Sequence, residues 1–177
     1  PKFEFDHFVL QSKGYSLPLK TFWDTKYDLI IFDNHPIEEN SDEWRSYLRV
    51  FAKKILSQKT SLALIAGYDI QKNIFESYLK LMELNYKKSI MKLESQFPWE
   101  ITENWERTFP FTGSIFSNEY QNNFPPIHVG INIDPNNANV LANFSISEMD
   151  VPLLLLSEKG PLRFAVWSSP DLHLLHF

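Results

Sequence analysis

Carboxylates and a histidine follow two apolar runs that have the length of buried strands. Asp33 and His35 come directly after the run Leu29–Phe32, and Asp69 follows the run Leu62–Ala66. The carboxyl ends of parallel strands meet at one edge of a sheet, where open α/β sheets bind ligands. Asp33, His35 and Asp69 can in principle hold a divalent metal or serve a hydrolase. Aspartate, asparagine and proline are also ordinary turn residues. We favour the turn, and expect neither a metal nor a cofactor.

The stretch around Gly67 predicts a strand, a tight turn and a helix in succession. Apolar residues recur at helical spacing from Ile70 to Leu84. Nucleophiles often occupy such junctions, but this one holds no Cys, no Ser and no glycine-rich loop. Gly67, Tyr68 and Asp69 are therefore candidates for ligand binding only. The favoured alternative is that Asp69 caps the helix and Tyr68 packs on the surface. We expect Gly67 to supply a positive φ or a close backbone approach.

Two further groups are weaker candidates. His173 and His176 have a spacing that suits a metal on a helix, but apolar residues surround them and no carboxylate follows. Four aromatic residues in a proline- and asparagine-containing stretch can bind sugars or a partner's side chains, although aromatics in a long loop usually fix that loop to the body. These four are Trp99, Trp105, Phe109 and Phe111.

Composition excludes several classes of function. The 177 residues carry a net charge of -5 with scattered basic residues, which argues against a nucleic-acid partner. The absence of cysteine excludes disulfides, thiol catalysis and cysteine-ligated metal. No apolar run has the length of a membrane span, so we expect no direct membrane insertion. We expect a single α/β domain over residues 1–177, and, since it opens on Pro1, a segment of a longer protein.

The first half of the chain predicts alternating strands and helices. Phe3–Val9 alternates like a half-buried strand, and Leu29–Phe32 and Leu62–Ile65 are short buried strands. An apolar stripe over Trp44–Ile55 predicts the first helix, and Ile70–Leu84 the second. This order predicts a three-layer α/β sandwich with a mainly parallel, flavodoxin-like central sheet and an antiparallel C-terminal extension. Leu29–Phe32 and Leu62–Ile65 should be neighbouring or near-neighbouring strands.

The second half predicts a long loop followed by short strands. Lys87–Gln96 alternates weakly like an edge strand, and Phe97–Pro126 is predicted to be an ordered loop. The strands expected after it are Ile127–Val129, Val140–Phe144, Pro152–Leu156 and Leu162–Trp167, the last two joined by a hairpin turn at Gly160.

Several pieces together resemble a known family. Tyr27–Phe32, Trp44–Ile55 and Leu62–Gly67 follow the order found in the class I glutamine amidotransferase-like fold. The second half is similar to non-catalytic amidotransferase-like domains of bacterial membrane-anchored envelope proteins. In those domains a proline-containing strand lead-in, a Gly-x-x-Arg hairpin and a closing tryptophan segment recur in that order. The matching pieces here are Phe124–Ile127, Asn139–Ala142, Val151–Leu155 and Gly160–Trp167.

The resemblance implies a domain that does not catalyse glutaminase chemistry. The family's cysteine position falls near Tyr68, and His128 is followed by Val129 and Gly130 instead of the family's His-x-Glu. Such domains also begin with a strand and a helix that this sequence lacks before Phe3–Leu10.

The implied function is a scaffold or interaction domain of a larger envelope protein, with other protein domains or subunits as partners. We expect an extracytoplasmic location, with the cytoplasm as the alternative. The competing hypothesis is a hydrolase-like enzyme that uses Asp33, His35 and Asp69.

Overall fold

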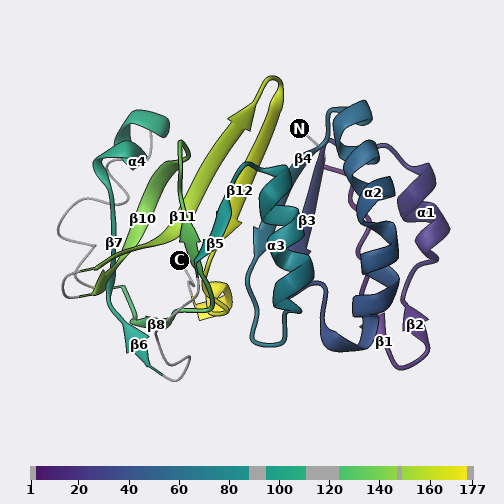
Figure 1. Ribbon diagram of the computed structural model, residues 1–177, viewed down its shortest axis with the longest axis horizontal. Coiled ribbons are helices and arrows are strands. Elements are labelled where there is room, and N and C mark those ends of the chain that lie inside the picture. The colour runs from purple at the N-terminus through teal and green to yellow at the C-terminus, as the bar shows by residue number, and fades with distance from the viewer. Residues whose placement is uncertain (1–2, 88–94, 111–123, 147–148, 175–177) are drawn as a thin grey trace.

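The computed structural model describes residues 3–87, 95–110, 124–146 and 149–174 (Figure 1). Its helices are α1 (Leu19–Asp24), α2 (Ser41–Gln58), α3 (Lys72–Leu81) and α4 (Glu103–Thr108), with single 3-10 turns η1 (Glu38–Asn40) and η2 (Leu172–Leu174). Its strands are β1 (Leu10–Gln11), β2 (Gly14–Tyr15), β3 (Leu29–Asp33), β4 (Ser61–Ile65), β5 (Asn85–Lys87), β6 (Gln96–Phe97), β7 (Trp99–Ile101), β8 (Ile127–His128), β9 (Asn132–Asp134), β10 (Asn139–Ile146), β11 (Met149–Lys159) and β12 (Leu162–Trp167).

A six-stranded mixed sheet with the order β3-β4-β12-β11-β10-β7 forms the centre of the molecule. β3, β4 and β12 run parallel to one another, so two of the five strand pairings in this sheet are parallel. The other three pairings, β12 with β11, β11 with β10 and β10 with β7, are antiparallel. Three small two-stranded antiparallel sheets accompany it in the described residues. The predicted flavodoxin-like three-layer sandwich with a mainly parallel sheet is therefore wrong. The narrower prediction that Leu29–Phe32 and Leu62–Ile65 are neighbours is confirmed, since β3 pairs with β4 in parallel.

The connections explain why the sheet is mixed. α2 links β3 to β4 as a crossover, and a crossover returns the chain parallel to the first strand. β11 and β12 are joined instead by a tight turn at Gly160, whose φ of 58° is in the left-handed region. A tight hairpin reverses the chain, so these strands pair antiparallel.

One face of the parallel strands is buried under helices. The Phe32 ring lies 5.1 Å from that of Phe51 and 5.3 Å from that of Trp44, both on α2, and 5.5 Å from Tyr78 on α3. Phe22 of α1 joins the same group through Trp44 and Phe51. α1, α2 and α3 therefore all lie on one side of β3, as the view of α2 and α3 in front of β3 and β4 also shows (Figure 1).

The opposite face of the same strands carries apolar residues that are not buried. Ile31, Ala63, Ala165 and Leu156 lie in register across β3, β4, β12 and β11. Ile31 is 57% exposed, and Leu29 on the same face of β3 is 50% exposed. Ala63, Ala165 and Leu156 are partly exposed. We call these four residues and Leu29 the open face.

A second, smaller core forms in the antiparallel half of the sheet. The Trp99 ring stacks on Phe124 at 4.3 Å and meets the Trp167 edge at 6.1 Å. The prediction of a loop over Phe97–Pro126 is wrong in its described part, which contains β7 and α4. Residues 111–123 lie outside the described residues, and so does Phe111 of the predicted aromatic cluster.

The remaining element predictions have mixed outcomes. Phe3–Val9 is not a strand, and pairing begins only at Leu10 in β1. Asn85–Lys87 and Gln96–Phe97 are short strands, but most of the predicted edge strand between them falls outside the described residues. The helices predicted over Trp44–Ile55 and Ile70–Leu84 are present as α2 and α3, and the four later strands are present as β8, β10, β11 and β12. None of the helices in the described ranges combines the length and the apolar character that crossing a bilayer requires.

Candidate functional site

The carboxyl ends of the three parallel strands meet at one rim of the sheet. Asp33 ends β3, Gly67–Asp69 follows β4, and Asp171 follows β12. The register that pairs Asp33 with Ile65, and Ile65 with Trp167, places these chain segments side by side. The rim is therefore the place where the predicted candidates can meet.

Gly67 is required because a side chain fills the space beside it. A Cβ at Gly67 would lie 2.0 Å from Oδ1 and 2.3 Å from Cβ of Asn34. The close approach expected at Gly67 is thus confirmed, with a side chain as the neighbour. The positive φ belongs instead to Asn34, at 46°. Asn34 Oδ1 accepts a hydrogen bond from the Asp69 amide at 3.2 Å, which joins the turns after β3 and β4.

The two carboxylates predicted at the rim do not form a binding site with His35. Asp33 and Asp69 are exposed. The interpretation of Asp69 as the helix cap is wrong, because the residue that precedes α3 is Gln71 and it makes no capping side-chain hydrogen bond. Among the described residues, no three His, Asp or Glu side chains gather closely enough to hold a metal ion.

His35 points into the aromatic core instead of the rim. Its ring lies 4.5 Å from Trp44 and 4.6 Å from Phe32. The ring nitrogen Nε2 is buried and has no hydrogen-bond partner among the described residues. This burial lowers the pKa of His35 to about 4, because the charged imidazolium is disfavoured away from water. His35 is therefore a neutral core residue at neutral pH.

The pKa of His35 predicts a loss of stability in mild acid. A histidine whose folded pKa lies below its unfolded value stabilises the fold above about pH 6.5, and that stability is lost as the pH falls toward 4. From pH 7 to pH 5.5 the loss should be about 1 kcal/mol. Urea unfolding of the wild type and of His35→Phe measures it. The variant should lose that much less stability over this interval, and equal losses in the two proteins would contradict a neutral, buried His35.

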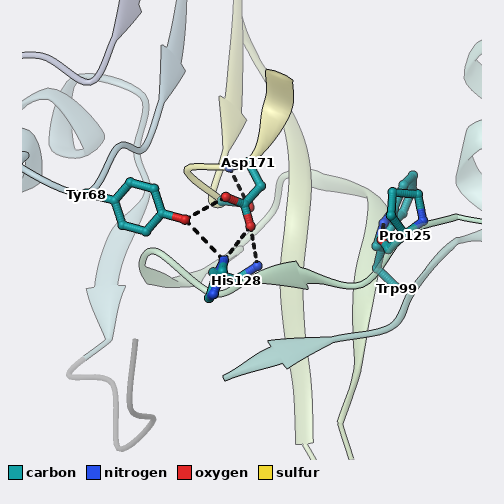
Figure 2. Close-up of polar contacts among 6 residues, drawn as sticks. Tyr68, Trp99, Pro125, His128 and Asp171 are labelled. Carbon is teal, nitrogen blue, oxygen red and sulfur yellow. Dashed lines mark hydrogen bonds and ion pairs between the residues drawn. The ribbon is translucent and has the colours of Figure 1, made fainter. Parts of the chain in front are cut away.

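A polar cluster on the rim joins Tyr68, His128 and Asp171 (Figure 2). The Tyr68 hydroxyl donates to Asp171 Oδ1 at 2.7 Å. Asp171 Oδ2 lies 2.7 Å from both the backbone nitrogen and the ring Nδ1 of His128. Tyr68 Oη and His128 Nδ1 are 3.1 Å apart. The three residues come from the turn after β4, from β8 and from the segment after β12, so the cluster ties three parts of the chain together.

The hydrogen bonds of the cluster decide which groups are charged. Asp171 has a side chain only 1% exposed. Burial by itself raises the pKa of a carboxyl, but the hydrogen bonds from the His128 amide, the Tyr68 hydroxyl and the His128 ring outweigh it and lower the pKa of Asp171. The same bond to Asp171, with burial second, raises the pKa of Tyr68 to about 12. Tyr68 is therefore held as a protonated donor to an ionised carboxylate.

This geometry does not activate Tyr68 as a nucleophile. In a nucleophile–histidine–acid relay the two partners occupy opposite ring nitrogens, so that the imidazole passes the proton between them. Here Tyr68 and Asp171 both contact Nδ1 of His128. A raised pKa also opposes formation of the phenolate. The cluster is suited to holding the turn after β4 in place.

Sequence reasoning found Tyr68 but not its partners. The sequence indicated His128 only as a departure from the family's His-x-Glu pattern, and it gave no reason to select Asp171. Asp171 lies 43 residues after His128 and 103 after Tyr68, so no local spacing connects them. The predicted His173–His176 pair is not testable, since His176 lies outside the described residues.

Comparison of the chain with protein-family models, with curated proteins and with solved structures finds no match.

Proposed function

We propose that this chain is a non-catalytic interaction domain, in which the open face meets another polypeptide. The observation that carries the proposal is the exposure of Leu29 and Ile31 on an apolar sheet face. Contiguous exposed apolar surface on a folded domain usually marks a contact with a protein partner. Isolated exposed apolar residues need no such explanation, but Ile31 continues into Ala63, Ala165 and Leu156 on adjacent strands.

The chemistry of the rim supports a function without catalysis. The hydrolase-like alternative requires Asp33, His35 and Asp69 to converge. His35 is instead packed in the core, and both carboxylates are exposed. The nearest arrangement to a catalytic cluster, around Asp171, holds its tyrosine protonated. No specific observation favours the enzyme.

The resemblance to non-catalytic amidotransferase-like domains extends the proposal to the parent protein. On that resemblance we propose a larger bacterial membrane-anchored envelope protein, with this domain outside the cytoplasm and with other domains or subunits as its partners.

Site-specific photocrosslinking tests the interaction. A benzophenone amino acid at Ile31 of the full-length parent, in the cells that make it, should give a discrete crosslinked protein on irradiation. The matched control is Val50 on α2, which is 55% exposed compared with 57% for Ile31 but lies away from the open face. Crosslinks from Val50 as strong as those from Ile31, or none from either, would contradict the proposal.

A further inference from the structure

A groove of about 870 Å³ lies along the outer edge of β3. Residues 29–34 form one wall, and residues 4–10 form the other. β3 is the terminal strand of the sheet, and β4 is its partner within the described ranges. The groove therefore separates an unpaired strand edge from a nearby stretch of chain.

The backbone polar groups of alternate β3 residues face this groove. The Asn34 amide donates to Ile65 O, and Asp28 O accepts from the Ser61 amide, so the even-numbered residues direct their polar groups toward β4. Residues of a strand between parallel neighbours alternate between its two edges. The N–H and C=O groups of Leu29, Ile31 and Asp33 consequently point outward, where another strand can pair with them.

The second wall is held in position without pairing to β3. The Tyr27 hydroxyl donates to Asp6 Oδ2 at 2.7 Å, and the Phe8 ring meets Phe22 edge-on at 5.8 Å. Ser16 fixes the end of the segment, since its Oγ accepts from the Val9 amide at 2.9 Å. These contacts keep residues 4–10 beside the groove and leave the edge of β3 open.

The sequence of β3 contains no lysine and no proline, two residues that commonly protect an edge strand, and its charged residue, Asp33, is the last of the strand. Natural edges are commonly blocked by lysine, proline or a bulge. β3 reads Leu-Ile-Ile-Phe-Asp and pairs with β4 without a break in register. An unprotected apolar edge of this kind is a template for an added strand.

The charge of the groove restricts what can bind there. Among the described residues, its lining includes the carboxylates of Glu4, Asp6 and Asp33 and contains no Lys or Arg. A second copy of the chain fits poorly, because the acids Asp28 and Asp33 flank its own β3 core. Complementarity favours a partner that brings positive charge.

We propose that the groove binds an extended segment of a partner protein, which adds a strand to β3. The segment carries apolar residues at alternate positions, to continue the open face beyond Ile31, and Lys or Arg between them, to meet Glu4 and Asp6 of the opposite wall. This proposal rests on the proposed interaction function and identifies the chemistry of the partner.

Fluorescence polarisation with labelled heptapeptides tests the proposal. The probe alternates Val and Lys. One control alternates Val and Glu, and a second has the probe's composition with its Val and Lys residues in separate blocks. The alternating Val/Lys peptide should bind at least about tenfold more tightly than either control, since it alone combines strand pairing with charge complementarity.

Two variants separate backbone pairing from charge. Ile31→Pro removes an outward N–H while leaving the bonds to β4, and should weaken binding of the probe about tenfold. The double variant Glu4→Lys with Asp33→Lys should weaken binding of the probe by a similar factor. It provides a second test if Ile31→Pro does not fold. The matched charge control is Glu100→Lys with Glu103→Lys, placed on β7 and α4 and expected to leave binding unchanged.

The outcomes distinguish this inference from the proposed function. Equal binding of all three peptides, or equal weakening by both double variants, overturns the strand proposal. If Ile31 still gives specific crosslinks, the interaction function stands without it. Sedimentation that shows a dimer abolished by Ile31→Pro overturns the proposal in favour of a second copy.

Discussion

Replacing Gly67 with valine should lower the free energy of unfolding by about 3 kcal/mol, near the upper end for overpacking a filled site. The added Cβ would fall 2.0 Å from Asn34 Oδ1, a separation that atoms do not tolerate. Asn34 Cβ is only 2.3 Å away, so rotation of the asparagine side chain cannot relieve the clash. The backbone of one of the two turns must move, which also disturbs the Asn34–Asp69 hydrogen bond.

A double-mutant cycle with Asn34→Gly isolates this contact. Asn34 has a φ of 46°, which glycine adopts readily, so its replacement removes the obstructing side chain without backbone strain. Urea unfolding of Gly67→Ala, Asn34→Gly and the double variant gives the coupling energy. Gly67→Ala should be much less destabilising in the Asn34→Gly background. Simple additivity of the two substitutions would show that another neighbour, and not Asn34, requires the glycine.

The sequence allows prediction of the parts of the fold in which local pattern and environment agree. Ile30, Phe32, Leu62 and Leu64 are apolar because this face of β3 and β4 is buried under helices. The runs are continuous because the open face of the same strands is apolar as well. The apolar stripe of α2 is visible because that helix packs on the same face. These elements were predicted correctly, and so was their adjacency.

Strand direction was predicted wrongly because it depends on the connections between strands. Residues of β10, β11 and β12 have the same short apolar runs as a parallel sheet. Only two residues separate β10 from β11, and a tight turn joins β11 to β12, so neither connection is long enough for a helical crossover. The alternation of Phe3, Phe5, His7 and Val9 likewise predicted a strand. Residues 4–9 instead lie across a groove from β3 and pair with no strand in the described residues. The alternation of residues therefore indicated an extended backbone but could not indicate whether another strand pairs with it.

The sequence predicted that polar residues gather at the rim, but it did not predict which side chains contact one another there. Tyr68 could be predicted as a rim residue because it follows β4 directly. Asp171 lies beside Tyr68 only because β12 pairs with β4, and the sequence does not show that pairing. His35 showed the reverse error, because its position after β3 suggested the rim while its ring turns into the core. Backbone topology and side-chain direction, which spacing alone does not determine, account for both cases.

Replacing Asp171 with alanine should destabilise the domain by about 3 kcal/mol, because its buried carboxylate accepts hydrogen bonds whose donors would lose their partner. The His128 amide, the His128 ring and the Tyr68 hydroxyl all lose their acceptor. Tyr68→Phe removes only one donor and should be destabilising by about 1 kcal/mol.

Asp171→Asn provides the pH test of the same network, because it keeps the shape and one acceptor oxygen but not the charge. The folded pKa of Asp171 is lowered, so its ionised form stabilises the fold above the unfolded pKa of 3.8, and this contribution is lost as the pH falls through the folded pKa. The wild type should therefore be more stable than Asp171→Asn at pH 7, and the difference should shrink below about pH 4. Denaturant unfolding at pH 7, 5 and 3 measures the difference. If the difference in free energy of unfolding between the two proteins stays constant to pH 3, the charge of the Asp171 carboxylate does not hold the cluster together. The cluster joins β8 to the turn after β4 and to the segment after β12.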